Sequence, residues 1–321
     1  MSGKNYSAYP FSGIPSFLRA PIATKENKLA ESDYTIGIIG VPFDEGCPFV
    51  PGSRFCARAM REQSLRFSER GYYDHQDKKT YLGDELARKK MVDFGDVNII
   101  PTDVEGSFER ITEAAKKVID KDALLIAMGG DHAITYPVVR AFKGKPIHVL
   151  HLDSHTDFLP IQPNFKNTNT HPFTHISKME HVKSLTQVGY RSIRDFTGLD
   201  SAAQGNRVIG MEEFRELGPK GIANILPEGE PCYVSIDIDV LDSSLVPGCV
   251  SAEPNGMMYA ELRDILAEVA KHNQIVGFDM VEVSPDLDVG TNITSYLATQ
   301  IVVEFLGKIC DQPYWKKRYD E

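Results

Sequence analysis

The sequence has little of what marks a secreted, membrane or nucleic-acid-binding protein. Its five cysteines are scattered over 321 residues without a CxxC pair, which disfavours a disulfide framework or a zinc knuckle and favours a reducing compartment. No uninterrupted run of about 18 apolar residues occurs, and the N-terminus lacks a basic start followed by an apolar stretch. We therefore expect a cytoplasmic protein with no membrane partner.

Positive charge is also in short supply. Lysine and arginine number 35 against 45 aspartates and glutamates, so the formal net charge is -10 at pH 7. An acidic surface disfavours nucleic acid and anionic membranes as partners, and it is compatible with a small cationic ligand. An acidic surface also favours solubility without any ligand, so the charge alone assigns no function.

Linkers and low-complexity tracts are missing from the middle of the chain. Residues 1–33 are polar and contain Pro10, Pro15 and Pro21, which predicts an N-terminal arm. Residues 34–321 are predicted to form a single domain, because α/β folds reach this length as one unit.

Apolar and β-branched runs alternate with segments of helical spacing. The predicted strands are 34–41, 91–94, 123–128, 147–152, 185–189, 207–211, 232–236 and 274–280. The predicted helices are 53–67, 108–119, a segment just after residue 132, 211–217, 259–271 and 294–308. Residues 158–181 are predicted to be a polar loop, and Trp315 with the basic residues after it a solvated end. This alternation predicts a mainly parallel sheet of roughly eight strands covered on both faces.

Polar side chains follow four of these strands at the point where each one ends. They are His132 after strand 123–128; Asp153, His155 and Asp157 after strand 147–152; Asp237 and Asp239 after strand 232–236; and Glu282 after strand 274–280. In a parallel sheet, ligands bind beyond the carboxyl ends of the strands. We therefore expect these side chains to lie at one edge and to form one site.

The types of side chain in this set indicate a metal centre. Four aspartates and two histidines form an oxygen-rich set with some imidazole, which favours Mn²⁺, whereas zinc sites use more sulfur or nitrogen. Two divalent ions would neutralise the four carboxylates, whereas a single divalent ion would leave half of the negative charge unbalanced. Two ions about 3.5–4 Å apart can share a water molecule and lower its pKa, which predicts hydrolysis.

Four ordered motifs give the chain a resemblance to the ureohydrolase family, the arginase and agmatinase group. They are GGDH at 129–132, DSHTD at 153–157, SIDIDVLD at 235–242 and EVSP at 282–285, supported by GVPFD at 40–44 and PGSR at 51–54. With the strands between them they cover about residues 35–310. GVPFD and the Glu253-Pro254 pair resemble the agmatinase branch more than arginase itself.

The resemblance implies a three-layer α/β fold, a dinuclear manganese centre and hydrolysis of a guanidino group to urea. It makes residues 34–321 a catalytic domain and implies the metal ligands His132, Asp153, His155, Asp157, Asp237 and Asp239. Glu282 would hold the guanidinium ion and Asp157 would aim the metal-bound hydroxide. A homo-oligomer, trimer or hexamer, is also implied.

The same resemblance implies a histidine, in the loop after DSHTD, that protonates the leaving amine. His171 is the predicted acid and His175 its rival. Aligning the loop on Phe173 would instead place Asn169 where the family has its histidine.

The predicted function is hydrolysis of a small, agmatine-like guanidino compound to urea and an amine, with two Mn²⁺ per subunit or nickel as the alternative. Guanidino acids such as guanidinobutyrate and guanidinopropionate, free guanidine or alkylguanidines, and formimidoylglutamate are alternative substrates. The run Val250-Ser251-Ala252 favours the last of these, whereas a loop that offers a histidine disfavours it. A non-catalytic regulatory relative is disfavoured because all six ligands are present.

Overall fold

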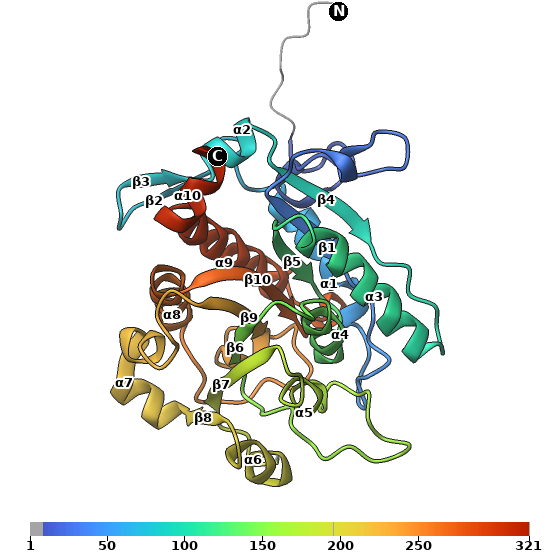
Figure 1. Ribbon diagram of the computed structural model, residues 1–321, viewed down its shortest axis with the longest axis vertical. Helices are drawn as coiled ribbons and strands as arrows, with labels where there is room; N and C mark the ends of the chain where they lie inside the picture. The colour runs from blue at the N-terminus through green and yellow to red at the C-terminus, as the bar shows by residue number, and fades with distance from the viewer. Residues whose placement is uncertain (1–8, 195, 321) are drawn as a thin grey trace, which may run out of the picture.

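A single eight-stranded sheet forms the centre of the computed structural model, which describes residues 9–194 and 196–320. The strand order is β4-β1-β5-β10-β9-β6-β7-β8, and all the neighbouring strands in it pair in parallel (Figure 1). The strands are β1 (Ile36–Gly40), β4 (Met91–Asp96), β5 (Leu124–Met128), β6 (Ile147–Leu152), β7 (Val182–Tyr190), β8 (Arg207–Gly210), β9 (Pro231–Asp237) and β10 (Gln274–Val281). Each overlaps a predicted strand, so the predicted sheet is confirmed.

Helices cover both faces of the sheet and make a three-layer α/β fold (Figure 1). On one face lie α1 (Cys56–Ser64), α7 (Met211–Ala223), α8 (Tyr259–His272) and α9 (Ile293–Cys310), packed in the order α1-α9-α8-α7. On the other face lie α3 (Val104–Ile119), α4 (Thr135–Arg140) and α5 (Pro172–Ile176). Peripheral elements are the antiparallel pair β2 (Tyr72–Asp74) and β3 (Lys79–Tyr81), with α2 (Gly83–Ala87), α6 (Phe196–Ala203) and α10 (Pro313–Asp320).

Strand β5 shows why the central strands are apolar throughout. Its side chains alternate between the two faces, as in any strand. Leu124, Ile126 and Met128 belong to the core on the α9 side, whereas Leu125 and Ala127 belong to the core on the α3 side. Both faces are covered, so neither set of side chains needs to be polar.

Helix α9 has the length and hydropathy of a membrane span, but its position is that of a core helix. Of its 18 residues, 67% are buried inside the protein. It packs against α1 on one side and α8 on the other. Its apolar character is therefore explained by the layer in which it lies.

Several segments differ from the sequence-based expectations, including β2, β3 and α2, which were not predicted. Trp315, predicted in a solvated end, is 0% exposed and packs in the core through α10, while Lys316 and Lys317 are exposed. The predicted loop 158–181 contains the short helix α5. Helix α6 lies in a segment for which no helix was predicted.

Residues 1–8 of the predicted arm lie outside the described residues. The rest of the arm runs into the core, where Phe17 and Leu18 are buried. The backbone N–H of Phe17 donates a hydrogen bond to Asp93 in β4, and Arg61 in α1 makes two bonds to the same carboxylate, at 2.8 and 2.9 Å. The buried Asp93 thus joins the arm, a helix and an edge strand.

Candidate metal centre

Seven of the eight predicted site residues, all except His171, lie at one edge of the sheet, where four neighbouring strands end. Strands β5, β10, β9 and β6 are consecutive and parallel, so their carboxyl ends point the same way. The residues are His132 after β5, Glu282 after β10, Asp237 and Asp239 at the end of β9, and Asp153, His155 and Asp157 after β6.

The turn that brings His132 to this edge requires two glycines. Gly129 and Gly130 have φ angles of 60° and 107°, a region that other residues rarely adopt. A Cβ atom on Gly129 would lie 2.3 Å from the Cβ of Cys56, and one on Gly130 would lie 2.5 Å from the carbonyl oxygen of Phe43. The two glycines of the GGDH motif therefore allow β5 to end in a tight, packed turn.

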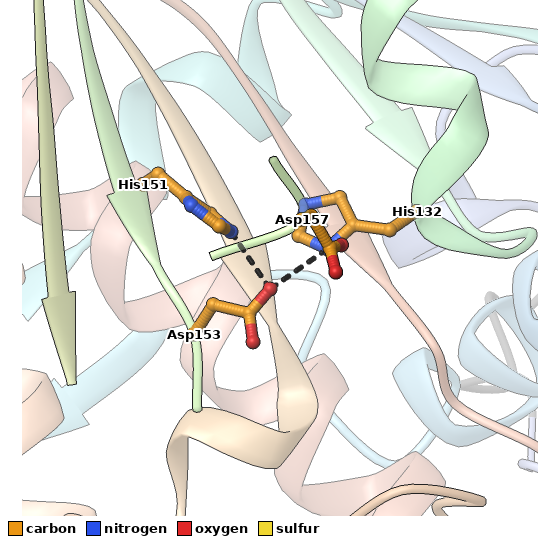
Figure 2. Close-up of side chains that lie close together, drawn as sticks. All are labelled: His132, His151, Asp153 and Asp157. Atoms are coloured by element: carbon orange, nitrogen blue, oxygen red, sulfur yellow. Dashed lines mark hydrogen bonds and ion pairs between the residues drawn. The ribbon is translucent and has the colours of Figure 1, made fainter. Parts of the chain in front are cut away.

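His132 stands at the centre of three carboxylates. Its Nδ1 atom lies 3.0 Å from Asp153 Oδ2, 3.0 Å from Asp157 Oδ2 and 3.1 Å from Asp237 Oδ2. In an octahedral metal site with bonds of about 2.1 Å, neighbouring ligand atoms lie about 3 Å apart. Figure 2 shows His132, Asp153 and Asp157 turned toward one another. Their spacing therefore fits ligation of one ion.

The other ring nitrogen of His132 is held by a hydrogen-bond chain. His132 Nε2 lies 2.9 Å from Ser235 Oγ, and the Ser235 hydroxyl donates to Asp279 Oδ1 at 2.7 Å. The Ser235 oxygen therefore accepts from Nε2–H, and Nδ1 is the atom left to face the carboxylates. Burial alone lowers the pKa of His132, but its bonds to the three aspartates outweigh burial and raise that pKa well above 6.5. The position at Nδ1 thus demands a positive charge, which a metal ion can supply in place of a proton.

A second group of ligand atoms lies next to the first. His155 Nδ1 is 3.4 Å from Asp153 Oδ1 and 3.0 Å from Asp239 Oδ2. Because Asp153 offers Oδ2 to the His132 group and Oδ1 to the His155 group, its carboxylate can bridge two ions. The six predicted ligands therefore lie together, in one group around His132 and one around His155.

Buried negative charge dominates this edge. Burial and the neighbouring charge of Asp153 raise the pKa of Asp157 to about 7. Burial and Asp239 raise the pKa of Asp237 well above its usual range. Such crowding of buried carboxylates is costly unless cations neutralise it. Two divalent cations would balance the four aspartates.

Two of the acidic residues also have strained backbones. Asp157 and Glu282 have φ angles of 47° and 62°, in the left-handed region that non-glycine residues rarely adopt. Strain of this kind gathers at functional sites, where the surrounding structure holds it in place. Here it turns both carboxylates toward the same cavity.

A cavity of about 300 Å³ opens above the carboxylates. The residues that line it are Cys47, Pro48, Phe49, His155, Asp157, Leu159, Asn169, Thr170, Arg194, Asp237, Asp239, Val250, Ser251 and Glu282. Glu282 Oε1 accepts hydrogen bonds from the backbone N–H of His132 at 2.9 Å and from Asn169 Nδ2 at 3.2 Å. The predicted guanidinium-binding residue thus lies beside the metal ligands.

Neither candidate acid is among the described residues that line this cavity. His171 is 0% exposed, its Nδ1 lies 2.7 Å from Thr168 Oγ1, and burial lowers its pKa. His175 stacks on Tyr136, with ring centroids 4.3 Å apart, on another surface. The described residues of the 158–181 loop that do line the cavity are Leu159, Asn169 and Thr170.

Sequence reasoning missed His151, which supports Asp153 from behind. His151 Nε2 lies 2.7 Å from Asp153 Oδ2, as Figure 2 shows, and burial lowers its pKa to about 4. Gln187 Nε2 donates to the Thr156 carbonyl at 2.6 Å and to His151 Nδ1 at 2.8 Å. His151 is therefore neutral and donates from Nε2–H, which orients Asp153. The sequence feature that could have identified His151 is its position two residues before Asp153, because alternate residues along a strand lie on the same face.

Cys249 also lies beside the centre, where its closeness in sequence to β9 predicts a buried, inert thiol rather than a reactive one. Its sulfur lies within 4.8 Å of carboxylate oxygens of Asp237 and Asp239. Burial, together with these carboxylates, raises the pKa of the Cys249 thiol well above its usual range. It is therefore held as a neutral thiol beside the centre.

Comparisons with known proteins agree with this geometry. The sequence pattern of the arginase family matches residues 34–307. The proclavaminate amidinohydrolase of Streptomyces clavuligerus is 33% identical over 305 residues, covering 92% of this chain and 93% of that protein. Its solved structure matches with a TM-score of 0.81 at 31% identity, over 94% of this chain and 99% of that one.

Two further relatives differ in what their names say they act on. The mitochondrial guanidino acid hydrolase of Homo sapiens is 32% identical over 306 residues, covering 92% of this chain and 82% of that protein. The solved formimidoylglutamase of Bacillus subtilis has a TM-score of 0.79 at 25% identity, over 93% of each chain. The chain therefore belongs to the arginase family, whose members are binuclear metal-dependent hydrolases of guanidino and related compounds.

Proposed function

We propose that this protein hydrolyses a small guanidino acid, releasing urea and an amino acid. The observation that carries the substrate class is a cavity with metal-ligating carboxylates and Glu282 among its lining residues, together with one arginine. A cavity lined by both kinds of charge can bind a molecule that is cationic at one end and anionic at the other.

Glu282 is the residue proposed to hold the guanidinium ion. Its carboxylate is buried, lines the cavity and is oriented by the His132 backbone and by Asn169. A carboxylate can accept two N–H groups of a planar guanidinium ion, in a strong, charge-assisted contact. This places the guanidinium carbon over the aspartates that follow β6 and β9.

When bound, the two metal ions would supply a water molecule activated for attack on that carbon. The water oxygen becomes the oxygen of urea, and the carbon–nitrogen bond to the tail of the substrate breaks. Asp157 lines the cavity and is proposed to pass both protons of the water, one after the other, to the departing amine nitrogen, so that a guanidinium ion and water give neutral urea and an ammonium group. Atoms and charge balance without any further reactant.

Arg194 is the proposed partner of the substrate's carboxylate. It is the one arginine or lysine among the described residues that line the cavity, and its side chain is 63% exposed. Glu253 holds it, with Oε1 at 3.0 Å from Nε and 2.7 Å from Nη2. The ammonium tail of agmatine would meet a like charge here, so the structure favours guanidino acids over the agmatine-like substrate predicted from sequence.

Formimidoylglutamate is the second candidate substrate. Its carboxylates could also bind Arg194. A histidine offered by the 158–181 loop would count against this substrate, and no histidine of that loop lines the cavity in the described part of the chain. Val250 and Ser251, which favoured this substrate in the sequence, do line it. Its hydrolysis would release formamide, so the product separates the two candidates.

Manganese is the proposed metal, because oxygen ligands outnumber imidazoles, with nickel as the alternative. We also propose the cytoplasmic location expected from the composition and the trimeric or hexameric assembly that the family resemblance implies.

The test is a substrate panel with purified protein loaded separately with Mn²⁺ and Ni²⁺. Guanidinobutyrate, guanidinopropionate, agmatine, free guanidine and formimidoylglutamate are compared by urea and formamide release. We expect a guanidino acid to give the highest kcat/KM, and Arg194→Gln to lower that value at least about tenfold while leaving agmatine turnover little changed. Faster turnover of agmatine would contradict the tail assignment, and no turnover of any compound would contradict the proposed function.

A further inference from the structure

Asn169 is presented to the cavity by a rigid turn. The turn spans residues 168–171 and is closed by the backbone N–H of His171, which donates to the Thr168 carbonyl at 3.1 Å. The N–H of Asn169 itself donates to the Gly46 carbonyl at 3.1 Å. A Cβ atom on Gly46 would lie 3.0 Å from the Asn169 nitrogen, so the close approach depends on glycine there. The Asn169 backbone is therefore fixed from two sides.

The orientation of the Asn169 amide follows from its partner. Glu282 Oε1 already accepts the backbone N–H of His132, so it acts as an acceptor toward Asn169 as well. The amide nitrogen of Asn169 must then face Glu282, and its carbonyl oxygen Oδ1 must face the other way.

Asn169 Oδ1 is a buried acceptor that nothing in the described part of the chain satisfies. Buried carbonyl oxygens almost always accept a hydrogen bond, because an unmade bond is unfavourable. The side chain lines the cavity, so a donor can reach it from the cavity contents. The cavity lining thus includes two neighbouring residues that offer acceptors, Glu282 with its carboxylate and Asn169 with its amide oxygen.

We propose that Asn169 is a substrate-binding residue whose Oδ1 accepts an N–H of the substrate's guanidinium group beside Glu282. The inference rests on the proposed function, because it places the guanidinium ion in the same cavity. A guanidinium ion has N–H groups on every edge of its plane and can serve both acceptors at once. An amide has no proton to release near neutral pH, so Asn169 acts by binding and positioning rather than as the acid expected in this loop.

The test measures binding rather than turnover. Guanidinium chloride is titrated calorimetrically into the metal-loaded enzyme, and Asn169→Leu replaces the amide by an apolar group of similar size. We expect guanidinium affinity to fall about tenfold to a hundredfold, as for loss of a hydrogen bond to a charged group. Asn167→Leu, on the same loop but outside the cavity lining, should leave the affinity unchanged. Tetramethylammonium, a cation without N–H groups, should bind both variants equally.

Two further readouts keep the test decisive. Metal content and the unfolding midpoint show whether Asn169→Leu keeps the native fold, and Asn169→Ala is the second variant if leucine is not accommodated. Guanidinium affinity within twofold of wild type in a folded, metal-loaded variant would overturn the proposal. Binding that depends on Asn169 in an enzyme that hydrolyses no guanidino compound would leave this inference standing and refute the proposed function alone.

Discussion

Asp153 joins the two halves of the metal centre. One of its carboxylate oxygens lies 3.0 Å from His132 Nδ1 and the other 3.4 Å from His155 Nδ1. His151 donates to the first of these oxygens from a neutral ring, and Gln187 fixes which ring nitrogen carries the proton. Asp153 would therefore be held in a fixed orientation if it ligates metal ions.

The placement of His171 leads to a prediction about the proton donor. Loss of a general acid costs about 10²–10⁴-fold in rate. Because His171 lies outside the cavity lining and burial lowers its pKa, we expect His171→Asn to lower kcat by less than about tenfold. The measurement is kcat against pH on the best substrate, with His175→Asn as the matched control. A loss of a hundredfold or more, with one limb of the pH profile removed, would restore His171 as the acid.

The positions of the candidate metal ligands could be predicted from the sequence because each is fixed by local structure. Asp153, His155 and Asp157 follow an apolar strand directly, and so do Asp237 and Asp239. Parallel pairing alone then brings these residues to one edge. Asn169 could not be predicted in the same way, because its position depends on a contact with Gly46, far away in the sequence.

At the scale of the elements, the eight strands were predictable because both faces of the sheet are buried, which leaves long apolar runs. The C-terminal helix α10 was not. Its sequence is polar apart from its aromatic side chains, and basic residues follow Trp315 directly. What decides its position is the packing of Trp315 into the core shared by α8 and α9, which no local pattern reveals.

This packing predicts a large effect on stability. Trp315→Ala should lower the free energy of unfolding by about 3–5 kcal/mol, because it leaves a cavity where a fully buried aromatic ring was. Lys317→Ala, on the exposed side of the same helix, should change it by less than about 0.5 kcal/mol. Urea unfolding followed by far-UV circular dichroism measures both. Equal midpoints for the two variants would show that α10 does not contribute to the core.

At the scale of the whole molecule, the fold brings negative charge from two strand ends to one edge. The chain carries a formal charge of -10, and four aspartates of that total gather around two histidines. All four aspartates are buried, where an unbalanced charge is costly. Bound cations would balance the charge of these buried carboxylates. The helices on both faces of the sheet hold this edge in place.

The central claim is that this edge binds two divalent ions. The direct measurement is the metal content of the purified protein after Mn²⁺ loading and exhaustive dialysis, determined by plasma mass spectrometry. We predict about two ions per chain for wild type and for Asp242→Asn, and clearly fewer for Asp237→Asn, which alters a ligand in the same SIDIDVLD run. A single tightly held ion in wild type, or two ions retained in Asp237→Asn, would contradict the dinuclear centre.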